Sequence, residues 1–75
     1  MNEATWIEKM RAGEGTLYHV TCAMLREEHD RREAMQATAM RAWEKQSTLR
    51  RAESFGTWAV RICINVCKDI RRKSK

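Results

Sequence analysis

Apolar residues recur along the chain at steps of three and four, the spacing of helices with one buried face. A first helix is predicted over residues 3–27. Gly13 and Gly15 fall inside it, and each costs about 1 kcal/mol relative to alanine. We therefore expect either a continuous helix or one that is kinked or broken near these glycines. The positions predicted to face inward are Trp6, Met10, Leu17, Val20, Thr21 and Met24.

A second helix is predicted over residues 31–46, because Asp30 is a good N-cap and Glu33 follows it at the spacing of a capping box. Residues 47–53 are polar and predict a loop, after which a third helix is expected over residues 54–72. The inward face of the second helix is predicted to contain Met35, Ala39, Ala42, Trp43 and Gln46.

The third helix carries two different stripes when residues 55–75 are placed on a wheel of 3.6 residues per turn. The apolar stripe contains Phe55, Trp58, Ala59, Ile62, Val66 and Ile70. A narrower polar stripe beside it contains Thr57, Arg61, Asn65, Lys68 and Arg72. Cations suit phosphates and an amide can read a base edge, so this face predicts a nucleic-acid surface.

Composition supports an all-α fold, since the 75 residues include no proline and only three glycines. We expect a compact three-helix bundle forming a single domain over residues 1–75. No apolar run approaches the roughly 20 residues of a membrane span, and no export leader is evident. A cytoplasmic protein is therefore expected, with Cys22, Cys63 and Cys67 buried and reduced.

Charge is segregated along the chain. Residues 1–49 contain seven Lys/Arg and eight Asp/Glu, whereas residues 50–75 contain eight Lys/Arg and two Asp/Glu. The net charge of +5 thus resides in the last third. A solvated basic tail would explain residues 71–75, but it explains Arg61 and Lys68 less well, because they lie inside the helix.

Two segments resemble a known family. They are Asp30-Arg-Arg-Glu-Ala-Met-Gln-Ala-Thr-Ala-Met-Arg-Ala-Trp43 and Phe55-Gly-Thr-Trp-Ala-Val-Arg-Ile-Cys-Ile-Asn65. With Asp69 and Arg72 after them, they resemble region 2 of extracytoplasmic-function (ECF) sigma factors. That family typically shows Asp-x-Glu-Asp-Ala-x-Gln-Glu leading to Ala-Trp, then Phe-x-x-Trp-Leu-x-Arg-Ile-x-x-Asn. The likeness spans about residues 14–73.

The resemblance implies a three-helix, non-enzymatic domain that binds RNA polymerase core and helps to open the minus-ten promoter element. The resemblance implies that Asp30, Glu33 and Gln36 bind the clamp helices of the largest polymerase subunit. In the family, the loop and third helix grip the non-template strand and hold an extruded base. The matching DNA-binding positions, together with neighbours on the polar stripe, are Leu49, Arg50, Arg51, Ser54, Thr57, Arg61, Asn65, Lys68, Asp69 and Arg72.

Three departures from the family pattern bear on core binding. Ala37 stands where the family has a glutamate, Ala39 replaces a large apolar residue, and Arg31 and Arg32 add positive charge beside Asp30. The family usually also carries a second domain, region 4, which is not in this chain, so a fragment of a longer factor is expected. An anti-sigma factor is a further partner that the resemblance implies, and the free chain is expected to be a monomer.

Other interpretations stay open. The chain could be an independent DNA-binding protein whose third helix enters duplex DNA, or an adaptor that uses only its acidic helix. Asn65 could cap or link helices, Asp69 could pair with Arg72 or Lys73, and Trp43 and Trp58 are expected in the core. No cofactor is expected. A metal site is not expected either, since Cys63 and Cys67 supply only half of a zinc ligand set.

Overall fold

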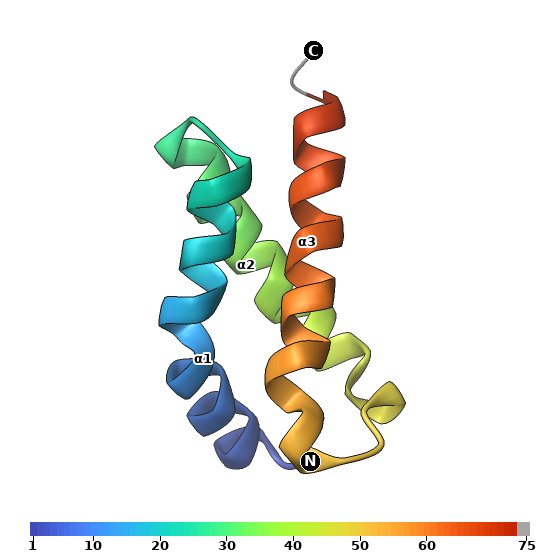
Figure 1. The fold of residues 1–75 in the computed structure, drawn as a ribbon. Helices are drawn as coiled ribbons and strands as arrows, with labels where there is room; N and C mark the ends of the chain where they lie inside the picture. The colour runs from blue at the N-terminus through green and yellow to red at the C-terminus, as the bar shows by residue number, and fades with distance from the viewer. Residues whose placement is uncertain (74–75) are drawn as a thin grey trace.

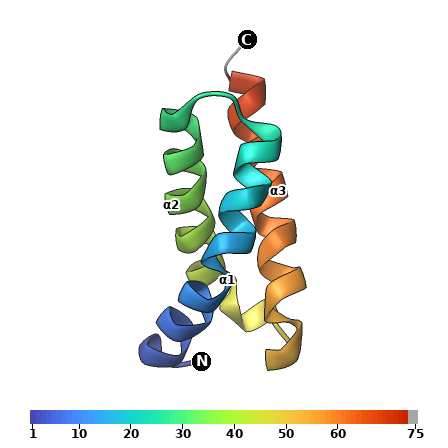
Figure 2. The same ribbon diagram turned by 60° about the vertical axis from the view of Figure 1, so that its left-hand side comes forward.

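The chain folds into three helices that run up, down and up, as the computed structural model of residues 1–73 shows (Figures 1 and 2). They are α1 (Glu3–Met24), α2 (Glu28–Glu44) and α3 (Phe55–Lys73). Two short 3₁₀ turns, Gln46–Thr48 and Ala52–Ser54, connect α2 to α3. The described residues contain no strand, and the predicted all-α three-helix bundle is confirmed. Lys75, part of the predicted basic segment, lies outside the described residues.

Helix α1 is continuous through both of its glycines, so the alternative of a break does not occur. Its first turn is capped by Asn2, whose side-chain oxygen accepts a hydrogen bond of 2.8 Å from the backbone N–H of Thr5. Leu17 and Thr21, in the turns after the glycines, are buried against the other helices. This packing offsets the low helix propensity of glycine.

The turn between α1 and α2 has the predicted length but lies three residues earlier in the sequence. Leu25 leaves α1 in an extended conformation and is only 4% exposed, so α1 ends at Met24. The Arg31 side chain donates a hydrogen bond of 2.9 Å to the carbonyl of Leu25. Helix α2 therefore begins at Glu28, and Asp30 lies in its first turn instead of capping it. The capping pattern predicted that α2 begins at residue 31. The burial of Leu25 ends α1 earlier, so α2 also begins three residues earlier than predicted.

The inward face of α2 also differs from the prediction. Its buried residues are Ala34, Thr38 and Ala42, one helical turn apart. Small side chains at this spacing bring α2 close to its neighbours, and the larger apolar side chains are displaced to the flank. Of the predicted face, Ala42 is buried; Met35, Ala39 and Gln46 are half-buried, and Trp43 is 40% exposed. The prediction of Trp43 as a core residue is wrong.

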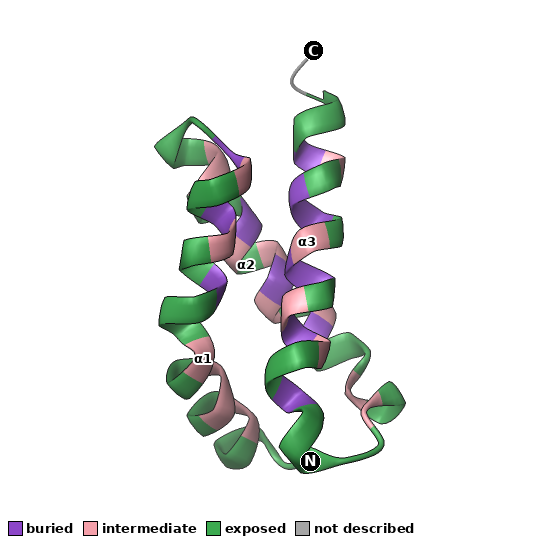
Figure 3. Cartoon of the chain, in the orientation of Figure 1, coloured by how far each residue is buried: buried purple, intermediate pink, exposed green. Residues whose placement is uncertain are grey.

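Helix α3 supplies much of the core, and its buried side faces the other two helices (Figure 3). The predicted apolar stripe is confirmed, with Trp58 half-buried and the other members buried. Cys63 and Cys67 are fully buried free thiols, as expected, whereas Cys22 is exposed on α1, contrary to expectation. None of the helices in residues 1–73 has the length and apolar character needed to cross a membrane.

Candidate nucleic-acid interface

The polar stripe of α3 lies on the surface of the bundle. All five of its members are exposed, while residues between them in sequence, such as Ile62 and Val66, are buried. Because successive positions are one helical turn apart, Arg61 and Asn65 emerge beside each other on the same side of the helix. The exposed members are Thr57, Arg61, Asn65, Lys68 and Arg72.

A hollow of about 560 Å³ opens where the α2–α3 loop meets the first two turns of α3. Loop and helix contribute to it together, and the hollow joins the polar stripe at Thr57 and Arg61. Six residues predicted from the sequence line it: Leu49, Arg50, Arg51, Ser54, Thr57 and Arg61. The other four candidates, Asn65, Lys68, Asp69 and Arg72, lie farther along α3.

Two lining residues were missed by the sequence analysis, and they hold the loop in place. The indole N–H of Trp58 donates a hydrogen bond of 3.1 Å to the hydroxyl of Thr48. That hydroxyl in turn donates to the carbonyl of Lys45, 2.7 Å away. Trp58 was assigned to the core because it lies on the apolar stripe, but its position next to Thr57 and three residues before Arg61 also placed it at the polar edge.

Asp69 is held by an ion pair between helices. Arg41 of α2 donates to its carboxylate at 3.2 Å, and the two side chains are 41% and 42% exposed. Asp69 thus pairs with Arg41 and not with Arg72 or Lys73, the partners that the sequence suggested. The pair links α2 to α3 and neutralises the one acidic side chain within the α3 segment.

The candidate core-binding residues lie on α2, away from its buried side. Glu33 and Gln36 are exposed, and Asp30 is half-buried in the first turn. Met40 and Trp43 continue the exposed face formed by Glu33 and Gln36, at steps of three and four residues, and are 66% and 40% exposed. The face therefore combines acidic, amide and large apolar groups.

The two arginines next to Asp30 are both engaged locally. Arg32 forms an exposed ion pair of 2.9 Å with Glu28, and the Arg31 guanidinium donates to the Leu25 carbonyl. These contacts direct the positive charges toward the start of α2. They reduce the conflict that Arg31 and Arg32 posed for an acidic binding face.

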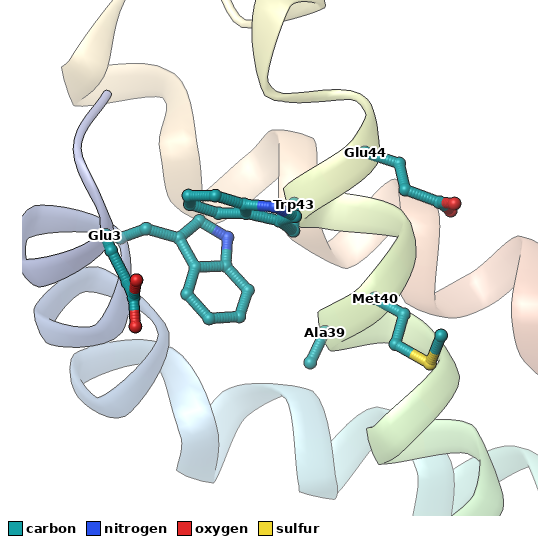
Figure 4. Close-up of a pocket in the computed structure, with 6 residues that line it drawn as sticks. Glu3, Ala39, Met40, Trp43 and Glu44 are labelled. Atoms are coloured by element: carbon teal, nitrogen blue, oxygen red, sulfur yellow. The ribbon is translucent and has the colours of Figure 1, made fainter.

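A shallow apolar hollow of about 540 Å³ lies where the start of α1 meets the end of α2 (Figure 4). Trp6 and Trp43 meet there edge to face, with ring centroids 5.3 Å apart. The Trp6 indole N–H is buried, and no described residue accepts a hydrogen bond from it. Ala39 lies in the wall of this hollow, where a larger side chain would occupy part of the space.

Neither the buried thiols nor the other ligand-type side chains form a metal site within residues 1–73. Burial raises the pKa of the Cys67 thiol to about 12, and the charge and hydrogen bonding of neighbouring Cys63 add to that shift. Cys63 itself donates a weak hydrogen bond of 3.7 Å to the carbonyl of Leu17. At neutral pH Cys67 is therefore a protonated core thiol, not a nucleophile.

The chain matches the family model described as Sigma-70 region 2 over residues 10–75, which is most of its length. Domains of this kind are non-enzymatic parts of transcription initiation factors, associated with RNA polymerase core binding and recognition of the minus-ten element. No curated protein and no solved structure matches the chain significantly. The start of α1, including Trp6, lies outside the matched residues.

Proposed function

This chain belongs to the sigma-70 region 2 family, and we propose that it is an ECF-type domain that binds polymerase core and the melted minus-ten element. The observation that carries the proposal is the continuity of the loop hollow with the cationic, amide-bearing face of α3. A hollow next to exposed cations suits an unpaired base and its flanking phosphates. We place this activity in the cytoplasm, with the polymerase.

On the DNA side, the proposal assigns a different role to each group. The loop hollow receives one extruded base of the non-template strand, with Arg51, Ser54 and Arg61 in its wall. Asn65 reads a base edge, since its amide both donates and accepts. Lys68 and Arg72 bind phosphates, and Leu49, Arg50 and Thr57 complete the walls of the hollow and the strand path. Asp69, which is paired with Arg41, lies beside these cations and lowers the positive charge of the phosphate-binding face.

On the polymerase side, we propose that the exposed face of α2 docks on the clamp helices of the largest subunit. Asp30, Glu33 and Gln36 supply polar and charged contacts around it. Met40 and Trp43 supply the apolar area, because exposed large apolar groups in a polar rim are typical of interface centres. An anti-sigma factor that covered either face would block the activity.

The proposal is tested by fluorescence anisotropy with labelled oligonucleotides carrying minus-ten-like sequences, as single strands and as duplexes. We expect the single strands to bind more tightly, with affinity falling steeply as salt rises. The double substitution R61E/K68E should weaken binding at least about tenfold, because both cations are replaced by repulsive charges. The control is Arg11→Glu, an exposed cation on α1 away from this face.

The alternatives predict other results. Tighter binding to duplex DNA would indicate a groove-reading protein and contradict the single-strand proposal. If the chain binds polymerase core but no oligonucleotide, and R61E/K68E has no effect, the chain is better described as an adaptor.

A further inference from the structure

A second hollow lies between α1 and the first turns of α3, directly beside the loop hollow. It encloses about 410 Å³, and Thr57 lines both hollows. Residues of α1 and of the first turns of α3 line it together, and Figure 1 shows these two helices running beside each other. The two hollows therefore adjoin each other at Thr57.

The hollow is open because two glycines face it. Gly13 of α1 and Gly56 of α3 both line it, and a Cβ atom placed at either one would meet nothing within 4 Å. Its floor is formed by Leu17 and Phe55, which are 2% and 6% exposed. The result is a space with an apolar floor that no side chain of residues 1–73 fills.

Polar groups stand at the edges of this space. Thr16 and Thr57 provide hydroxyls that can donate and accept hydrogen bonds. A neighbouring hollow of about 360 Å³ shares Gly13, Phe55 and Gly56 and adds Lys9 and Glu53. The Lys9 ammonium lies 5.9 Å from the centroid of the Phe55 ring.

We propose that this α1–α3 hollow is a second base subsite, which holds the nucleotide adjoining the one in the loop hollow. The inference rests on the proposed function, since it takes the occupant to be the same single strand. Its volume lies in the range of small-ligand pockets, and its apolar floor with two hydroxyls suits a base with its polar edge outward. Lys9 would then meet the phosphate on the far side of that base.

The geometry favours a nucleic-acid strand over a protein segment. The α1–α3 hollow adjoins the loop hollow, which is lined by Arg50, Arg51 and Arg61. On its other side it adjoins the smaller hollow that Lys9 lines. An unpaired strand with a charge on every nucleotide matches cations at both ends and an apolar centre. Glu53 is the acidic exception, at the Lys9 end.

The test is selection from a library of random single-stranded DNA octamers, followed by sequencing of the bound fraction and anisotropy with the selected octamer. Gly13→Leu fills the hollow from α1, and Gly56→Leu fills it from α3. The matched control is Gly15→Leu, a glycine of the same helix that does not line the hollow and also has open space at its Cβ. Replacing glycine by leucine inside α1 favours the helix, so neither α1 variant should unfold.

We expect the unaltered chain to select bases at two neighbouring positions. Both preferences should persist in Asn65→Ala, which separates them from any base that Asn65 reads. Both hollow-filling variants should lose selection at the same one of these positions. Their affinity should fall at least about fivefold, the lower end of what one stacked base contributes. Gly15→Leu should retain both preferences.

Four results would overturn the inference. If Asn65→Ala selects at one position only, or if Gly13→Leu keeps both preferences and full affinity, the second subsite does not exist while the proposed function stands. The second subsite is also excluded if the two hollow-filling variants bind all octamers more weakly but keep both base preferences. If the unaltered chain binds no octamer, the proposed function fails as well, which separates the two failures.

Discussion

Trp58 and Thr48 are joined by a hydrogen bond of 3.1 Å from the indole N–H to the hydroxyl, which connects α3 to the loop in front of it. The same tryptophan packs its ring against Phe55, with centroids 5.5 Å apart. One side chain thus faces the core and also fixes the wall of the loop hollow.

Breaking this bond should affect binding more than stability. Trp58→Phe keeps an aromatic ring and removes the donor, so we expect a loss of about 1 kcal/mol or less in the free energy of unfolding. Affinity for single-stranded minus-ten DNA should fall severalfold, because the loop is no longer held. Thr48→Val removes the other partner, and a double-mutant cycle measured by anisotropy should show that the two effects are not additive. Additive effects would mean that the bond does not organise the hollow.

Asn65 and Lys68 should respond differently to truncation. Asn65→Ala should change which base is preferred, because an amide reads a base edge. Lys68→Ala should weaken every oligonucleotide about equally and lower the salt dependence by about one phosphate contact. A panel of single-stranded oligonucleotides that differ at single positions, titrated at several salt concentrations, measures both. A uniform loss for Asn65→Ala would contradict the reading role.

Trp43 should contribute to core binding and not to DNA binding. Trp43→Ala removes a 40% exposed apolar ring from the face that carries Glu33 and Gln36. Truncating an aromatic side chain at an interface centre typically costs about 2 kcal/mol, so affinity for polymerase core should fall at least about tenfold. Tyr18→Ala is the matched control, since Tyr18 is 41% exposed on α1. If Trp43→Ala and Tyr18→Ala lose the same affinity for polymerase core, Trp43 is not part of the docking face.

The Arg41–Asp69 pair should be of small energetic value. Both side chains are about two-fifths exposed, so Asp69→Asn should cost at most about 1 kcal/mol in unfolding free energy, less at high salt. Single-stranded DNA should bind slightly more tightly, whatever its sequence, because a negative charge beside Lys68 and Arg72 is removed. A change in base preference measured by anisotropy would instead give Asp69 a direct reading role.

The high pKa of Cys67 predicts that stability decreases in alkaline solution. Its folded-state pKa is about 12 against an ordinary value of 9.0, so the folded chain keeps a proton that the unfolded chain loses. The stabilisation is complete below pH 9 and is lost as pH rises toward 12. Urea unfolding at pH 7.5 and pH 10.5 should show a loss of about 2 kcal/mol from this group. Cys67→Ala should lose less unfolding free energy between the two pH values. An equal loss in Cys67→Ala would contradict the raised pKa of Cys67.

The amino-acid sequence determined the three helices and the two faces of α3. The steps of three and four fix which side of a helix is apolar, so Ile62 and Val66 turn inward while Arg61 and Asn65 turn outward whatever the helix packs against. The loop candidates Leu49, Arg50, Arg51 and Ser54 followed from the resemblance, and the structure places them around one hollow.

Only the tertiary structure decided the orientation of α2 and the contacts between helices. The apolar residues of α2 cover a broad arc, and close approach through Ala34, Thr38 and Ala42 selected the buried side, leaving Trp43 on the surface. The Arg41–Asp69 pair and the hollow at Gly13 and Gly56 join residues far apart in sequence. A helical period carries no information about which neighbour a side chain will meet, because that depends on how the helices pack in three dimensions.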